Sequence, residues 1–197
     1  QVHKVTLKDG RELAIKVQYP GVAKSIDSDV ANVAALIRMS GLLPKGLDLA
    51  PYLAEARAQL HEETDYIREA AQTKRFADLL ADQPQFVVPK LVDDWSTSQI
   101  LAMSFEPGIA VEEAANESQE IRDQIATHLI ALTLREIFGF GFMQTDPNFA
   151  NYRYQSDTGR IVLLDFGAAR DISAPVARQY RRLLQAGLKD DAAGIQQ

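Results

Sequence analysis

Two polar segments in the second half of the chain constrain its fold more than any other feature. Asp146 and Asn151 lie five residues apart in a polar stretch. Further along, the apolar run Ile161–Leu164 leads directly into Asp165–Gly167, an Asp-Phe-Gly turn. The Ser156–Gly159 turn that separates the two segments predicts a hairpin. A hairpin would bring the polar stretch and the acidic turn close together at its open end, so we expect them to act together.

The rest of the chain mixes strands and helices without a regular alternation. Apolar spacing predicts strands at residues 2–8, 11–18, 86–88, 100–103 and 161–164, and helices at 22–40, 51–81, 120–138 and from 175 onward. The signals expected at their ends are a hairpin at Asp9-Gly10, a break at Pro44–Gly46 and an N-cap at Ser118. This order of strand pairs and helices favours an α+β fold over a doubly wound sheet.

Composition excludes several classes of protein. The 197 residues suffice for one domain or one two-lobed unit, and the net charge of −6 argues against a nucleic-acid binder. The absence of cysteine excludes disulfides, thiol catalysis and cysteine-ligated metals. No apolar run approaches the roughly 18 residues of a membrane span. The chain begins at Gln1 without an initiator Met and stops within a helical pattern at Gln197, so we expect a fragment.

The strand expected at residues 11–18 carries a small residue and a lysine on one face. Because side chains alternate across a strand, Leu13, Ile15 and Val17 share the core face, and Ala14 and Lys16 share the other. A small side chain there leaves room for a flat base, and the ammonium group can reach phosphates. Taken alone, the pattern is more typical of an amphipathic strand with a solvated lysine.

Three acidic residues lie close together on the helix expected at 51–81. Asp65 and Glu69 are four residues apart, where like charges repel by roughly 0.2–0.5 kcal/mol, and Lys16 is a candidate cation to relieve them. A solvated acidic face is the more common interpretation of these two alone. Glu63 falls on the apolar stripe of the same helix, where an unpaired carboxylate is costly, so the pattern favours a paired, partly buried role. We expect Glu63 to be at least half buried or, failing that, to have lost its natural partner.

The polar stretch and the acidic turn supply the ligands that a magnesium nucleotide needs. Mg²⁺ prefers hard oxygen ligands, which the carboxylate of Asp165 and the amide oxygen of Asn151 provide. Asp146 can orient or deprotonate an attacking hydroxyl or water. Gly167 is expected to permit the backbone turn that aims Asp165 inward. Each motif alone is weak evidence, but together with an upstream Ala-x-Lys strand they point to kinase chemistry.

Several longer segments resemble one family, the UbiB or aarF-domain atypical kinases. They are Gln1–His3, Val17–Val22, Glu63–Ala71, Gln144–Asn148 and Leu164–Ala168. The similarity extends from Gln1 to about Arg170. It is strongest to the branch tied to coenzyme Q biosynthesis, in which Gln-Thr-Asp-Pro replaces a His-containing form.

The resemblance implies a protein-kinase-like two-lobed fold, here truncated at both ends. Residues 1–105 would form the N-lobe-like part, with a β-hairpin, a long helix and two strands. Residues 106–197 would form a partial C-lobe with the catalytic loop and the Asp-Phe-Gly turn. The family's Lys-x-Gly-Gln extension and its alanine-rich nucleotide loop are absent from this sequence, so we expect this fragment alone to be inactive.

The resemblance also assigns roles to individual residues. The implied ligands are ATP or ADP and Mg²⁺. Ala14 and Lys16 would bind the nucleotide, Lys16 would pair with Glu69, and Asp146 would act in catalysis. Asn151 and Asp165 would bind the metal at one shared site. Glu63 and Asp65 match the family's Glu-x-Asp motif, which contacts the Lys-x-Gly-Gln extension.

The function implied by the resemblance is that of an ATP-dependent atypical kinase or ATPase, a transferase, supporting ubiquinone biosynthesis. Expected partners are a nucleotide, membrane lipid, quinone precursors and quinone-biosynthesis enzymes. The expected location is the cytoplasm, or the mitochondrial matrix in a eukaryote, with peripheral membrane association of the full-length protein.

Other functions remain as alternatives. A catalytically silent nucleotide-binding scaffold would keep the same fold. A conventional protein kinase is disfavoured, because no Ala-Pro-Glu-like segment follows Asp165. An aminoglycoside-type phosphotransferase shares the fold and is disfavoured only by the family resemblance.

Overall fold

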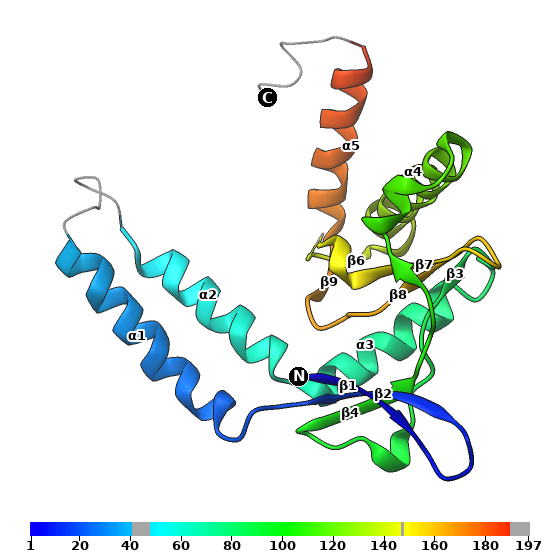
Figure 1. The fold of residues 1–197 in the computed structure, drawn as a ribbon. Coiled ribbons are helices and arrows are strands. Elements are labelled where there is room, and N and C mark those ends of the chain that lie inside the picture. Colours follow the sequence, from blue (N-terminus) through cyan, green and yellow to red (C-terminus); the bar gives the residue numbers. More distant parts are fainter. Residues whose placement is uncertain (41–47, 147, 190–197) are drawn as a thin grey trace. The chain divides into compact units, whose positions relative to one another are not determined.

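The computed structural model describes residues 1–40, 48–146 and 148–189 (Figure 1). The chain break expected at Pro44–Gly46 and the last residues of the chain lie outside the described residues. The chain divides into two compact units, each assembled from segments that are far apart in sequence. The first unit consists of Gln1–Asp78, Val88–Pro107 and Asp165–Ala168, and the second of Leu79–Val87, Gly108–Leu164 and Ala169–Gln197.

The first unit contains an antiparallel sheet in the order β1-β2-β4. Its strands are β1 (Val2–Thr6), β2 (Glu12–Val17) and β4 (Ile100–Ser104). The predicted hairpin between β1 and β2 is confirmed, and Gly10 in its turn has a φ of 86°, a conformation that glycine adopts without steric cost. Since β2 is the central strand, the register fixes Lys16 opposite Leu101 of β4.

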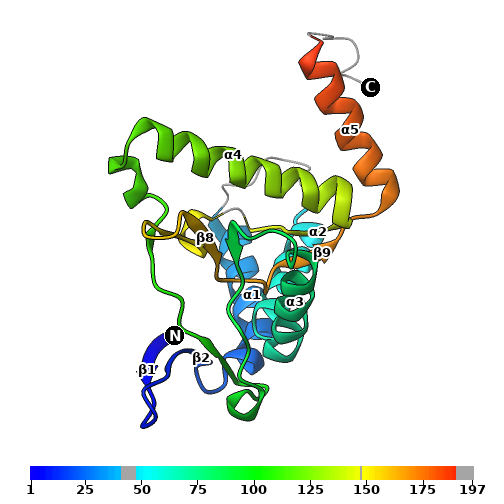
Figure 2. The same ribbon diagram turned by 90° about the vertical axis from the view of Figure 1, so that its right-hand side faces the viewer.

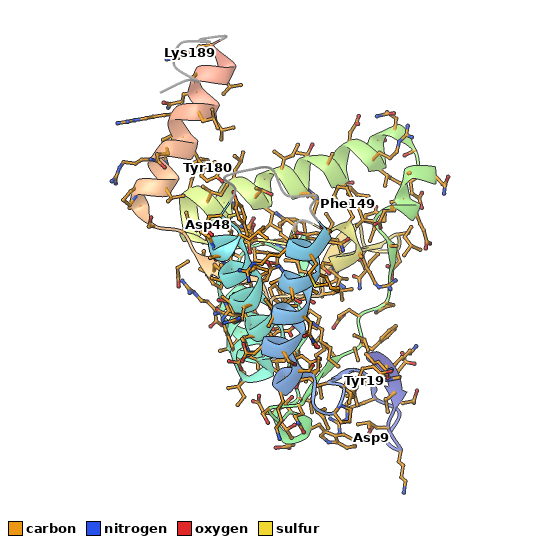
Figure 3. All side chains as sticks on the ribbon, turned by 90° about the vertical axis from the view of Figure 1, so that its left-hand side faces the viewer. Asp9, Tyr19, Asp48, Phe149, Tyr180 and Lys189 are labelled. Atoms are coloured by element: carbon orange, nitrogen blue, oxygen red, sulfur yellow. The ribbon has the colours of Figure 1, made fainter. Side chains whose placement is uncertain are left out.

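Three helices accompany this sheet. They are α1 (Val22–Ser40), α2 (Ala50–Glu63) and α3 (Tyr66–Leu79). The first two run side by side, as Figure 3 shows. Ile26, Val30 and Ala34 form the buried stripe of α1, at the i, i+4, i+8 spacing of one helix face.

The prediction of one helix over residues 51–81 is wrong, because Thr64 and Asp65 separate α2 from α3. The side chain of Asp65 accepts a hydrogen bond of 2.9 Å from the backbone N–H of Arg68, so Asp65 caps the start of α3. The two helices also differ in burial, because α2 buries none of its residues whereas α3 buries four. Because the Asp65 side chain bonds a backbone N–H in the first turn of α3, the break between the two helices costs little free energy.

The second unit contains a four-stranded sheet in the order β3-β8-β7-β5 and a separate pair of strands, β6 and β9. The bounds are β3 (Phe86–Val87), β5 (Ile109–Ala110), β6 (Phe142–Gln144), β7 (Tyr152–Gln155), β8 (Arg160–Leu163) and β9 (Ala169–Asp171). The predicted hairpin across Ser156–Gly159 is confirmed as β7 and β8. The strands expected at 86–88 and 100–103 lie in different sheets, since β3 pairs in parallel with β8 and β4 pairs with β2.

Two longer helices belong to the second unit, α4 (Gln119–Arg135) and α5 (Ala174–Leu188). Ser118 caps α4 as predicted, because its side chain accepts a hydrogen bond from the N–H of Ile121. The chain continues from α4 into a π-helical turn, η3 (Glu136–Phe140). In Figure 2, α4 lies across the view and α5 rises from near its C-terminal end. Short 3₁₀ turns lie at η1 (Asp93–Trp95), η2 (Glu113–Asn116) and η4 (Phe149–Asn151).

Each unit has its own apolar core. In the first, Tyr66, Leu101 and Met103 are buried together, and Ala14 packs against them. In the second, Phe142, Ile161 and Val162 have no exposed surface. No helix within residues 1–40, 48–146 and 148–189 is both long enough and apolar enough to cross a membrane.

Candidate functional site

The first unit brings Lys16, Glu69 and Asp165 together. The ammonium group of Lys16 contacts the carboxylate of Glu69 and lies 2.9 Å from Oδ2 of Asp165. These residues come from β2, from α3 and from the turn after β8. The predicted ion pair of Lys16 and Glu69 is therefore confirmed.

The Asp165–Gly167 turn is anchored on α3. Oδ1 of Asp165 accepts a hydrogen bond of 2.9 Å from the N–H of Gly167, and the carboxylate of Glu69 accepts one from the N–H of Phe166. The guanidinium of Arg68 donates to the carbonyl oxygen of Gly167. The ring of Phe166 packs on that of Phe76, with 4.8 Å between the ring centroids. Polar and apolar contacts thus hold the turn in one place.

The expected reason for Gly167 is wrong. Its φ is not positive, so the backbone conformation does not require glycine. What the position lacks is room, because a Cβ there would lie 3.3 Å from Oδ1 of Asp165 and 3.7 Å from Oε2 of Glu69. Glycine at this position leaves the space that the Asp165 carboxylate occupies.

Burial and neighbouring charges shift the pKa values in this group. Burial works against the charge of Lys16, but the carboxylates of Glu69 and Asp165 outweigh it and raise the pKa of Lys16. Burial raises the pKa of Glu69 against the opposing effect of Lys16, and the carboxylate of Asp165 raises it further. One ammonium between two carboxylates leaves a net negative charge when all three are ionised, which favours the approach of a further cation.

Asp146 and Asn151 come together in the second unit. The side-chain amide of Asn151 donates a hydrogen bond of 2.9 Å to Oδ2 of Asp146. The backbone N–H of Asp146 donates to Oε1 of Gln144, at 3.0 Å. At the far end of the loop, the backbone N–H of Leu164 donates to the carbonyl oxygen of Asn151. Pro147, inside the sequence motif, lies outside the described residues.

The predicted site residues therefore fall into two groups. Lys16, Glu69 and Asp165 belong to the first unit, and Asp146 and Asn151 to the second. The shared metal site of Asn151 and Asp165 stays a prediction. Ala14 packs on the apolar cluster of the first unit, and its contact with a nucleotide base also stays a prediction.

The two carboxylates of the Glu-x-Asp motif lie at the junction of α2 and α3. Glu63 is exposed and accepts a hydrogen bond from Gln59, one turn earlier, so the half burial expected for it is not found. The alternative, that Glu63 has lost its natural partner, stays a prediction. The sequence suggested one apolar stripe over residues 51–81, but the helix ends at Glu63 and α2 buries none of its residues. Asp65 is also exposed, and it caps α3.

Two residues of these groups were missed as site residues by the sequence analysis. Nothing in the sequence distinguishes Arg68 from the other charged residues of its helix. Its contact with Gly167 joins residues that are far apart in the sequence. Glu136 is 5% exposed and accepts a hydrogen bond from the backbone N–H of Gln144. A signal for Glu136 does exist, because it follows the buried Ile125 and Leu132 at helical spacing on the apolar stripe of α4.

Comparison with known proteins decides the family. The model of the ABC1 atypical kinase-like domain matches residues 1–197. The chain belongs to this family. The expected resemblance to atypical kinases is confirmed.

Among curated members of the ABC1 family, the atypical kinase COQ8B, mitochondrial, of Rattus norvegicus is 46% identical over 191 residues, which are 97% of this chain and 36% of that protein. The atypical kinase COQ8, mitochondrial, of Saccharomyces cerevisiae is 41% identical over 194 residues, 98% of this chain and 39% of that protein. A chloroplastic member of Arabidopsis thaliana, ACTIVITY OF BC1 COMPLEX KINASE 8, is 30% identical over 88% of this chain and 24% of that protein. The COQ8 relatives are mitochondrial, and this chain spans little more than a third of their length.

Solved structures place the ABC1 chain among kinase-like folds. Rv3197 of Mycobacterium tuberculosis, solved as a complex with erythromycin, matches with a TM-score of 0.77 and 28% identity over 99% of this chain and 49% of that chain. Rio2 kinase of Chaetomium thermophilum, solved as an ADP/Mg²⁺-phosphoaspartate complex, matches with a TM-score of 0.53 and 15% identity over 98% of this chain and 50% of that chain. At that identity the Rio2 likeness concerns the fold alone. The prediction of a kinase-like α+β fold is confirmed.

Proposed function

We propose that this chain is the core of an ATP- and Mg²⁺-dependent atypical kinase or ATPase that supports coenzyme Q biosynthesis. The observation that carries the proposal is the contact of Lys16 with Glu69 and Asp165. The two acidic residues come from different parts of the chain. A lysine that was merely exposed to solvent would not be expected to contact both of them. Membership of the ABC1 family and the names of the COQ8 relatives support the same function.

In this proposal, the residues around Lys16 bind and orient the phosphates. Lys16 stays protonated, because two carboxylates face it, and it holds a phosphate oxygen when the nucleotide is bound. Glu69 keeps the lysine in place from α3. Ala14 lies two residues before Lys16 on β2 and contacts the base.

Asp165 and Asn151 fit a magnesium site by their chemistry. One carboxylate and one amide oxygen are a small donor set, but Mg²⁺ commonly takes its remaining ligands from phosphates and water. No cluster of three or more His, Cys, Asp or Glu suited to a metal occurs in the part of the chain that the structure describes, so the nucleotide would have to complete the site. When bound, Mg²⁺ offsets the charge of the phosphates.

Asp146 is the proposed catalytic residue. Its carboxylate accepts a hydrogen bond from Asn151 and is held at its backbone by Gln144, so its orientation is fixed from two sides. From that position it orients the attacking hydroxyl or water and accepts its proton. Glu63 and Asp65 would contact the family's Lys-x-Gly-Gln extension, for which their exposure leaves them accessible.

The experiment is ATP turnover by the full-length protein, with Asp165→Asn as the test variant. Asp157→Asn is the matched control, because Asp157 is an exposed carboxylate in the turn between β7 and β8. Turnover and Mg²⁺-dependent nucleotide affinity should both fall in the first variant and stay unchanged in the second. Nucleotide binding without turnover in the wild type would support the scaffold alternative instead.

The proposed partners can be tested in the same assay. Vesicles and phenols that resemble quinone precursors should raise turnover if the protein acts at a membrane on such compounds. A mitochondrial location is proposed for a eukaryotic source, by analogy with the COQ8 relatives. Turnover that responds to neither addition would contradict the lipid and quinone assignment while leaving the ATPase assignment intact.

A further inference from the structure

Glu136 is a buried carboxyl group that the proposed mechanism does not use. It begins the π-helical turn η3 and is 5% exposed. Its side chain accepts a hydrogen bond from the backbone N–H of Gln144. In the described ranges it makes no ion pair, and no cation contributes to its pKa. Its position thus needs an explanation other than charge pairing.

Burying this group is costly. Burial raises the pKa of Glu136 to about 7, although the Gln144 amide acts in the opposite direction. An apolar side chain would fit the stripe formed by Ile125 and Leu132 without that cost. The hydrogen bond to Gln144 is what the carboxyl group adds.

The π turn explains how Glu136 reaches Gln144. The N–H of Gly141 donates to the carbonyl oxygen of Glu136, and Gly141 takes a left-handed conformation with φ 61°. The chain thereby reverses, and β6 runs back past the start of η3. π-Helical turns are uncommon inside α-helices and occur frequently at functional sites.

Gln144 connects Glu136 to the loop of Asp146. The backbone of Gln144 is held by Glu136, and its side-chain oxygen accepts the N–H of Asp146 at 3.0 Å. Oδ2 of Asp146 then accepts from Asn151 at 2.9 Å. A continuous series of hydrogen bonds within the second unit thus leads from the buried carboxyl group to the proposed catalytic carboxylate.

We propose that Glu136 is a positioning residue, which holds Asp146 in its reactive orientation through Gln144. The catalytic part of this inference rests on the proposed function, and the positioning part does not. A side chain that serves only the stability of the core would be replaced by leucine without loss of turnover. A positioning side chain can be replaced without loss of turnover only by a group that still accepts the Gln144 hydrogen bond.

Three variants of the full-length protein separate these roles. Glu136→Gln keeps a carbonyl oxygen that accepts from Gln144. Glu136→Leu keeps the volume and removes the acceptor. Ile137→Val is the matched control, because Ile137 is the next residue of the same turn, is 8% exposed and lies outside the hydrogen-bonded series.

The first measurement is amide hydrogen exchange at Gln144 and Asp146. Exchange at both should become about tenfold faster in the leucine variant, as expected for the loss of one buried hydrogen bond, and stay near the wild type in the other two. The temperature of unfolding should change little in the leucine variant, because removing a buried carboxyl group offsets the cost of leaving the Gln144 N–H without its acceptor. Unchanged exchange in that variant, or equal acceleration in Ile137→Val, would overturn the proposal.

The second measurement is steady-state ATP turnover. kcat should fall about tenfold in Glu136→Leu while KM for ATP changes little, and Glu136→Gln should restore most of kcat. A leucine variant with faster exchange but wild-type kcat would overturn the catalytic part. If the wild type shows no turnover that depends on Asp165, the proposed function fails, and the exchange measurement still decides whether Glu136 positions the loop.

Discussion

Lys16 and Glu69 form an ion pair inside the first unit, although 53 positions separate them in the sequence. The side chain of Glu69 is 3% exposed and that of Lys16 13% exposed, so water screens neither group well. The lysine also contacts Asp165, so its ammonium group lies between two carboxylates. The stability of the first unit should therefore depend on the lysine more than on either acid.

Replacing Lys16 should destabilise the chain strongly. Lys16→Met leaves Glu69 buried without its cation, which costs about 3–5 kcal/mol for a buried pair. Glu69→Leu in the same chain should recover part of this loss, because both charges are then removed. Urea unfolding of the single and double variants measures the coupling.

The control for this prediction is Lys74→Met on α3, the helix that carries Glu69. Lys74 pairs with Asp93, and both side chains are more than half exposed, so its loss should cost no more than about 1 kcal/mol. Equal costs at positions 16 and 74 would contradict the assignment of a buried pair.

Gly167→Ala should disturb Asp165 rather than the backbone. A Cβ at 3.3 Å from Oδ1 forces the Asp165 carboxylate to move by a few tenths of an ångström. We expect Mg²⁺-dependent nucleotide affinity of the full-length protein to fall severalfold, with little change in the unfolding temperature. Gly139→Ala is the control, since a Cβ there meets nothing within 4 Å. Wild-type affinity in the Gly167 variant would show that the carboxylate tolerates the displacement.

The two carboxylates of the Glu-x-Asp motif should differ in their effect on stability. Asp65→Ala removes the cap of α3 and should cost about 1 kcal/mol, within the usual range of about 0.5–2 kcal/mol. Glu63→Ala should change the free energy of unfolding by less than about 0.5 kcal/mol, because Glu63 is exposed at the end of α2. Thermal unfolding of the two variants side by side tests this, and a larger loss at position 63 would show that Glu63 has a structural role in this chain.

Glu136 should make stability depend on pH between about 4.5 and 7. Its pKa is about 7 in the folded protein against 4.5 as the ordinary value, so the folded state retains a proton that the unfolded state has lost. Its contribution is therefore most favourable below pH 4.5, falls as pH rises to about 7 and is constant above. Tyr152 and Asp146 are the titratable groups nearby. Burial, together with the charges of Glu136 and Asp146, raises the pKa of Tyr152 to about 12, well outside this window.

Comparison with Glu136→Gln isolates this effect. The difference in unfolding temperature between the variant and the wild type should increase in favour of the variant as pH rises from 4.5 to 7. A difference that is the same at pH 4.5 and pH 8 would mean that Glu136 titrates normally in the folded chain.

Local sequence determined much of this protein. Asp9-Gly10 and Ser156–Gly159 specify their hairpins, because a turn that needs positive φ accepts few residues besides glycine. Ser118 specifies the start of α4, because its side chain satisfies an amide three residues away. The motif residues Lys16 and Asp165 were also recognisable, since their chemistry and spacing are unusual in combination.

Only the tertiary structure decided the features that depend on distant contacts. Periodicity could not reveal the break at Thr64 and Asp65, because the apolar residues on both sides of it keep near-helical spacing, and the cap that interrupts the helix is a single side-chain contact. The exposure of Glu63 follows from that break. The role of Gly167 is set by the carboxylates of Asp165 and Glu69, which the fold brings beside it. The burial of Glu136 depends on β6 returning past η3, and a one-dimensional pattern contains no information on where a strand returns.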